Sequence, residues 1–133
     1  MRALAVFGLG LAVSVSPVLA HHSVSAQYDV AREIAIRGVV TRIEWTNPHA
    51  RLWLDARNDD GTVSGWEMEL PPPNALKREL GGRDFVKQGD QVSVNVWRAK
   101  DGSRVAHILS LAAPDGRVMN FPRNGGWMTG APK

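Results

Sequence analysis

The stretch that decides the fold is VSGWEMELPPPNALKRELGG, residues 63–82. Its first part alternates apolar and polar side chains, with Trp66 and Met68 on one face, which is typical of a half-buried strand. Three consecutive prolines end this strand, because a proline has no N–H to donate to a sheet. Asn74 then favours the start of a short helix at residues 75–80, which a pair of glycines closes.

Alternating patterns of the same kind flank this stretch on both sides. We expect two strands before it, at residues 34–45 and 50–56, and two strands after it, at residues 91–98 and 104–112. Three strands, a short helix and two strands is the element order of the OB-fold, a partly open Greek-key barrel. We therefore predict an all-β, five-stranded OB-like barrel with one short helix between strands three and four. The alternative is an unrelated small β-sandwich.

The N-terminus is typical of a secretory signal peptide covering residues 1–20. Arg2 supplies the positive start, residues 3–15 form an uncharged apolar run, and Val18 and Ala20 occupy the −3 and −1 positions of the cleavage site. The run is too short to cross a bilayer, which takes about 20 apolar residues. We therefore expect an exported chain with no stable membrane insertion after the leader is removed.

The rest of the chain is long enough for one small domain. We expect an N-terminal arm at residues 21–33, the barrel at 34–119 and a flexible tail, rich in Gly, Pro and Asn, at 120–133. The absence of cysteine excludes disulfides and thiolate metal sites. The net charge is only +3 and no basic run occurs, so we expect no nucleic-acid partner.

Short motifs are spread over nearly the whole expected mature chain. They are HHS at 21–23 with QYD at 27–29, GVV at 38–40 leading into EWTNPH at 44–49, GWEMEL at 65–70 with PNAL at 73–76, GD at 89–90, WRAKDGS at 97–103 and PDGR at 114–117. Together they resemble DUF6152, a family of small exported bacterial proteins of unknown function. The resemblance implies a single β-rich domain, favours a Gram-negative periplasm and implies no activity.

A set of outward side chains on strands two to four forms a candidate ligand face: Arg51, Trp53, Glu67, Glu69 and Trp97. The surface of strands two and three is the usual ligand face of an OB-fold. An exposed tryptophan among charges can stack on a sugar, a heterocycle or an extended peptide. We therefore predict a non-enzymatic binding module for a small molecule, a peptide or a partner protein. The alternative is that both tryptophans cover a small core with the N-terminal arm or the tail.

Three histidines suggest copper binding as an alternative function. If cleavage follows Ala20, the amine and imidazole of His21 can chelate one metal ion. A second imidazole from His49 or His107 then completes a planar nitrogen set, which favours Cu(II). Against this, His21 can equally belong to a solvated terminus and His49 to a turn, and neither arrangement needs a metal.

Glu67 and Glu69 are the one pair of residues that suggests catalysis. Their Cα atoms lie about 7 Å apart along a strand, a separation compatible with glycoside hydrolysis. Alternating glutamates are also what a solvated strand face shows. Because no nucleophile motif, phosphate-binding loop or dinucleotide fingerprint accompanies them, we predict that the protein is not an enzyme.

Overall fold

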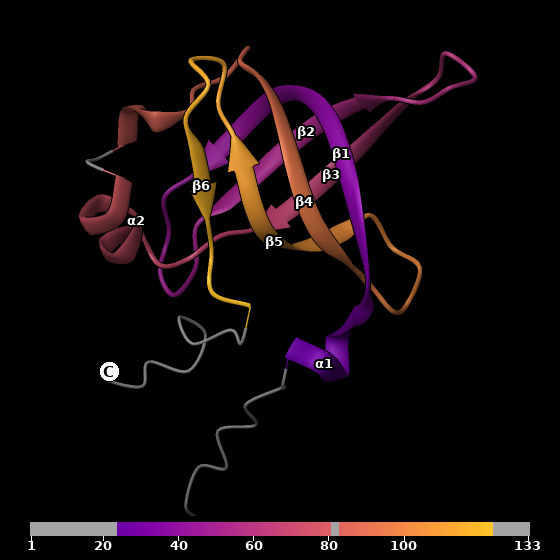
Figure 1. Ribbon diagram of the computed structural model, residues 1–133, viewed down its shortest axis with the longest axis horizontal. Coiled ribbons are helices and arrows are strands. Elements are labelled where there is room, and N and C mark those ends of the chain that lie inside the picture. The colour runs from indigo at the N-terminus through magenta and orange to yellow at the C-terminus, as the bar shows by residue number, and fades with distance from the viewer. Residues whose placement is uncertain (1–23, 81–82, 124–133) are drawn as a thin grey trace, which may run out of the picture.

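The computed structural model describes residues 24–80 and 83–123 (Figure 1). The predicted leader, His21, the glycine pair that closes the predicted helix and the end of the predicted tail lie outside these ranges. In chain order the elements are α1 (Val24–Gln27), β1 (Tyr28–Glu44), β2 (Arg51–Arg57), β3 (Val63–Glu69), α2 (Pro73–Leu80), the 3-10 turn η1 (Arg83–Phe85), β4 (Gln91–Ala99), β5 (Val105–Ala112) and β6 (Val118–Asn120).

The strands form one sheet that closes on itself. Neighbouring strands follow the order β3-β2-β1-β4-β5-β6, and a short parallel pairing of β3 with β5 closes a ring of five strands. The other pairings are antiparallel. Helix α2 lies between β3 and β4 in the chain and stands to one side of the barrel in Figure 1. The prediction of an all-β, five-stranded OB-like barrel with one helix after the third strand is therefore confirmed.

The long strand β1 is shared by both halves of the barrel. Its first half pairs with β4 and its second half with β2, and Gly38 belongs to both ladders, opposite Val92 and Ala56. A Cβ atom at Gly38 would lie only 2.7 Å from the carbonyl oxygen of Asp55. Glycine is therefore needed here because the backbones of β1 and β2 approach too closely for any side chain.

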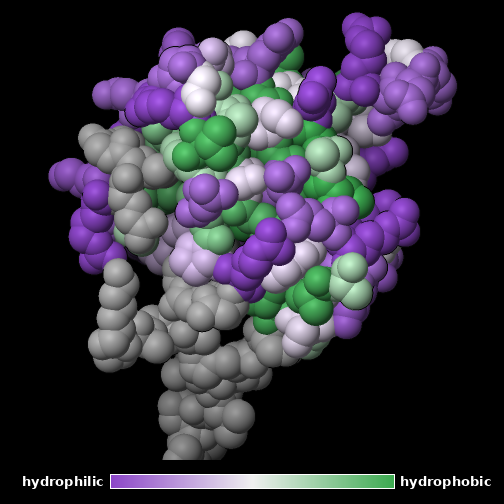
Figure 2. All heavy atoms as spheres, viewed as in Figure 1, coloured by the Kyte–Doolittle hydropathy of each residue, from purple (hydrophilic) through white to green (hydrophobic). Residues whose placement is uncertain are grey.

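The barrel interior is filled by aliphatic side chains from every ring strand, as period-two alternation predicts. The largest buried ones include Val40, Leu52, Leu54, Met68, Val94, Ile108 and Leu111. Leu76 of α2, with Phe85 and Val86 after it, joins the same core. On the outside, Figure 2 shows separate apolar patches between hydrophilic residues, as is common on the surface of a folded domain.

The N-terminal boundary of the barrel differs from the predicted one. Strand β1 begins at Tyr28, whereas we expected an arm as far as residue 33. Residues 30–33 are exposed on both sides of the strand, so they show no apolar–polar alternation. Tyr28 itself is buried and pairs with Ala99 across β4.

The C-terminal boundary differs as well. Residues 118–120, placed at the end of the domain and the start of the tail by the sequence, form the edge strand β6 against β5. Phe121 is buried in the main core, and its N–H donates to the carbonyl of Leu109 at 2.8 Å. A strand of three residues is too short for its alternation to stand out in a sequence.

Candidate functional site

The outward residues of β2 and β3 form a polar surface beside the β1–β2 loop, and we call it the β2–β3 face: Arg51, Trp53, Glu67 and Glu69. Cross-strand pairing sets Arg51 opposite Glu69 and Trp53 opposite Glu67. The guanidinium of Arg51 donates across the diagonal to Oε1 of Glu67 at 2.5 Å. The four residues predicted from alternation therefore do share one face.

Trp53 offers a flat apolar surface on this face. It is half-buried, and the guanidinium carbon of Arg42, its cross-strand neighbour on β1, lies 3.8 Å from its ring centroid. Arg42 also forms an ion pair with Glu44 at 2.9 Å. A cation over a tryptophan ring is a favourable arrangement, and here the guanidinium of Arg42 covers one side of the Trp53 ring.

Glu69 of β3 forms hydrogen bonds to two segments that are distant in sequence, the β1–β2 loop and the start of β1. Its Oε1 lies 2.6 Å from Nδ1 of His49 in the β1–β2 loop, and its Oε2 accepts the hydroxyl of Tyr28 at 3.1 Å. The side chains of His49 and Glu69 are only 15% and 19% exposed. Burial and the neighbouring Glu69 carboxylate both raise the pKa of Tyr28, so its hydroxyl keeps its proton and continues to donate.

His107 lies next to Glu69 across the β3–β5 pairing and is fully buried. Its ring stacks on Trp97, with centroids 5.7 Å apart and planes 14° apart, and tilts against Tyr28 at 5.4 Å. Burial lowers the pKa of His107, while Glu69 and a hydrogen bond to the backbone of Pro122 partly oppose that shift. His107 is therefore neutral at neutral pH. It lies beside a second, smaller cluster of buried residues on the outside of the barrel, which we call the outer core: Val24, Tyr28, Trp97 and Leu109.

Trp97 does not belong to the exposed ligand face, which corrects the sequence-based prediction. It is only 7% exposed and packs with Val24 of α1, Tyr28 and Leu109 in the outer core. A register irregularity between Asn95 and Val96 in the β4–β5 ladder accompanies two consecutive buried residues on β4. The alternative reading, in which the N-terminal arm covers a tryptophan, therefore holds for Trp97.

Of the three predicted metal ligands, the structure brings two close to the same glutamate and does not describe the third. His49 and His107 both neighbour Glu69, whereas His21 lies outside the described residues. Within residues 24–80 and 83–123, no group of three or more His, Cys, Asp or Glu side chains is arranged to hold a metal ion.

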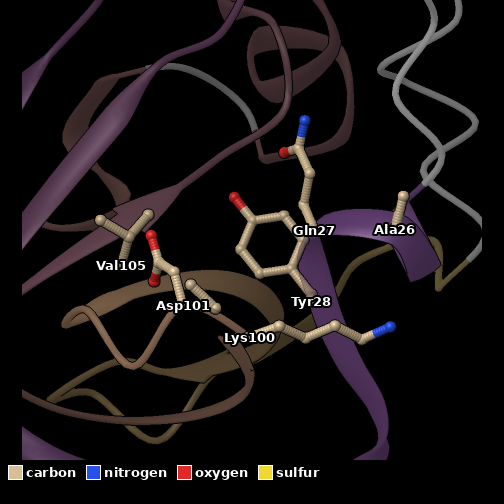
Figure 3. Close-up of a pocket in the computed structure, with 7 residues that line it drawn as sticks. Ala26, Gln27, Tyr28, Lys100, Asp101 and Val105 are labelled. Carbon is tan, nitrogen blue, oxygen red and sulfur yellow. The ribbon is translucent and has the colours of Figure 1, made fainter.

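A cavity of about 390 Å³ opens beside this cluster, between α1 and the β4–β5 hairpin (Figure 3). Tyr28 lies at its centre in the view of Figure 3, flanked by Gln27 and Val105. Lys100 fastens α1 to the hairpin: its Nζ donates to the carbonyl of Ser25 at 2.6 Å, and its backbone N–H donates to Gln27 at 2.9 Å. The local sequence pattern gives no sign of the role of Tyr28, although it is the single tyrosine of the chain.

The fold and this face define a small OB-like barrel with a polar, tryptophan-bearing surface next to the β1–β2 loop. The chain belongs to DUF6152, a family of unknown function that matches residues 10–108. No curated protein matches the sequence. Among solved structures, the chain is similar to the mitochondrial single-stranded DNA binding protein Rim1 of S. cerevisiae, with a TM-score of 0.49 and 10% identity over 62% of this chain and 93% of that one. No helix in the described ranges is long and apolar enough to cross a membrane.

His107 makes the stability of the barrel sensitive to acid. Because the pKa of folded His107 lies below the usual 6.5, the unfolded chain binds more protons below that pH. The contribution of His107 to the free energy of unfolding is therefore fully present above pH 6.5. It is lost as the pH drops toward the pKa of the folded protein, by at most about 1.4 kcal/mol per pH unit.

Urea denaturation at about pH 7.5 and about pH 5.5 measures this loss. The variant His107→Leu, which leaves the neighbouring Glu69 and His49 in place, should lose less stability than wild type between the two pH values. Equal losses in both proteins would assign the acid sensitivity to other groups.

Proposed function

We propose that the protein is an exported, non-enzymatic binding module that holds a small molecule, a peptide or a partner protein on its β2–β3 face. The observation that carries this proposal is the position of Trp53 among hydrogen-bonding charges on the outer surface of strands two and three. That surface, with the β1–β2 and β4–β5 loops beside it, is where OB-folds bind their ligands.

The chemistry of the face suits a polar ligand without a large charge. Arg51 with Glu67, and His49 with Glu69, supply donors and acceptors in close pairs, while Trp53 supplies a flat apolar ring. A sugar or an extended peptide can use both kinds of contact. The charges of the face are balanced in these pairs and form no continuous basic groove of the kind that tracks a phosphate backbone, which supports the expectation that nucleic acid is not the ligand.

The contacts of the two glutamates support a binding role over a catalytic one. Glu67 is held by Arg51, and both oxygens of Glu69 are engaged by His49 and Tyr28. Both carboxylates are therefore engaged by partners within the protein, and these contacts would have to break before either glutamate could act on a substrate.

Calorimetric titration of the protein purified from cells that express the whole chain tests the proposal. The panel holds soluble oligosaccharides, short peptides and a single-stranded oligonucleotide. We expect one sugar or peptide class to bind and Trp53→Ala to weaken that binding about tenfold or more, equivalent to roughly 1.4 kcal/mol.

A matched control is Val63→Ala, which truncates an exposed apolar side chain at the other end of β3. It should bind as wild type does. Equal binding by Trp53→Ala and wild type would remove the β2–β3 face as the site, and binding of the oligonucleotide alone would contradict the proposed ligand class.

Export is a separate part of the proposal. Cleavage after Ala20 predicts a mature protein that begins at His21 and is recovered from the periplasmic fraction. Intact-mass measurement of the secreted chain checks both points, and an uncleaved chain retained in the cytoplasm would contradict them.

Copper binding is the second candidate function, and the place of α1 favours it. Val24 packs with Tyr28 and Trp97, whose rings contact His107, and Tyr28 also donates to Glu69, the partner of His49. His21 precedes Val24 by three residues, so an extended chain reaches roughly 10 Å from that point. His49 is the better second ligand, because His107 is completely buried.

Electron paramagnetic resonance of the Cu(II)-loaded mature protein tests this candidate. We expect a nitrogen-ligated signal that is lost when one residue is added before His21 and weakened in His49→Ala. Equal copper binding by the extended protein would exclude a site built on the terminal amine.

A further inference from the structure

A second hollow lies on the outer surface of β1, β2, β4 and β5, and we call it the arginine groove. Its volume is about 640 Å³, and its lining includes Arg37, Arg57 and Ser93. Arg57 ends β2, whereas the β2–β3 face centres on Arg51 and Trp53 near the start of that strand. Arg57 lies four residues beyond Trp53 on β2, roughly 13 Å at the rise of an extended strand, so the arginine end of the groove lies apart from the Trp53 ring.

The groove is hollow because small residues meet on neighbouring strands. Ser93 on β4 pairs with Ala112 on β5 and with Arg37 on β1, so short side chains line the middle of the hollow. Val39, at 37% exposure, leaves an apolar surface within the hollow. A concave apolar floor with a few polar groups at its rim is the usual form of a small-molecule site.

Two arginines on neighbouring strands line the groove. The β1–β2 ladder ends at the Gly38–Ala56 pair, and Arg37 and Arg57 are the next residues on the two strands. Like charges at opposed cross-strand positions destabilise a sheet. Within the described ranges neither guanidinium takes part in an ion pair, and Asp55 of the same groove bonds to neither. Arg57 makes one long hydrogen bond, 3.4 Å, to the carbonyl of Gly61.

We propose that the arginine groove binds a small organic anion, with a carboxylate or phosphate head between Arg37 and Arg57 and an apolar body against Val39. Guanidinium groups present forked donors that match both kinds of oxyanion. Ser93, which pairs with Arg37, adds a hydroxyl beside the head, and Gln91, which pairs with Val39, adds an amide beside the body. A bound anion also offsets the repulsion between the two arginines, which gives the pairing a physical reason.

Phenyl phosphate is the probe for this site. Its binding is measured by NMR, through the amide chemical shifts of the protein purified as above. We expect saturable shifts at Gln91, Ser93 and Ala112. The double variant Arg37→Gln, Arg57→Gln should bind at least about tenfold more weakly, the loss expected when a charge-assisted pair is removed.

The matched control is Arg32→Gln with Arg78→Gln, which removes the same charge from two exposed arginines outside the groove. It should bind as wild type does. Benzoate and inorganic phosphate distinguish a carboxylate from a phosphate head, and neutral benzyl alcohol should not bind.

Three results would overturn the proposal: no saturable shifts, equal weakening by the control pair, or equal binding of benzyl alcohol. Trp53→Ala should leave phenyl phosphate binding unchanged. The arginine groove and the β2–β3 face can therefore fail or succeed independently of one another.

Discussion

Replacing Gly38 by alanine should lower the free energy of unfolding by about 1–3 kcal/mol, the usual cost of forcing an extra group into a packed position. The new Cβ would lie 2.7 Å from the carbonyl oxygen of Asp55 and 3.1 Å from its carbonyl carbon. Both atoms belong to the backbone of β2, so no side chain can rotate away. Relief requires the β1–β2 ladder itself to shift, where Gly38 pairs with Ala56.

Gly65 of β3 pairs with Asp55 from the other side of β2, and Gly65→Ala is the matched control. The nearest atom to a Cβ there is Oδ1 of Asp55 at 3.8 Å, an ordinary contact. Loss of unfolded-chain entropy should then make this variant equal to wild type or more stable by up to about 1 kcal/mol. Urea denaturation measures both changes. Equal midpoints for the two variants would show that the close approach at Gly38 is relaxed at no cost.

The element order could be predicted because each element carries its own local signal. Alternation identified β2, β3, β4 and β5, and the three prolines with Asn74 identified the helix that makes the order OB-like. The closure of the barrel has no such signal. The parallel pairing of β3 with β5 depends on the curvature of the whole sheet, and it is this pairing that brings His107 beside Glu69.

The candidate site shows the same division. Period two correctly placed Arg51, Trp53, Glu67 and Glu69 on one face, because these strands keep a regular register with each other. Alternation could not reveal that Glu69 also joins His49 and Tyr28, since those contacts span 20 and 41 residues. Such contacts follow from tertiary packing and leave no periodic trace in the sequence.

Trp97→Ala should be the most damaging of the variants considered, lowering the free energy of unfolding by about 3–5 kcal/mol as buried tryptophan truncations do. The indole is 7% exposed and covers the fully buried ring of His107. Its loss leaves a cavity beside that ring and removes the surface on which Val24 of α1 packs. Chemical denaturation measures the stability, and limited proteolysis after α1 should become faster.

Trp53→Ala provides the comparison that separates a structural tryptophan from a binding one. Trp53 is half-buried and lies under Arg42, so its truncation leaves the inner core intact and should cost clearly less stability. We therefore expect Trp97→Ala to lower the free energy of unfolding more than Trp53→Ala does. Trp53→Ala should be the variant that weakens ligand binding. Similar losses of stability in the two variants would contradict the assignment of Trp97 to a buried core, because they would mean that α1 and Tyr28 do not shield Trp97 from water.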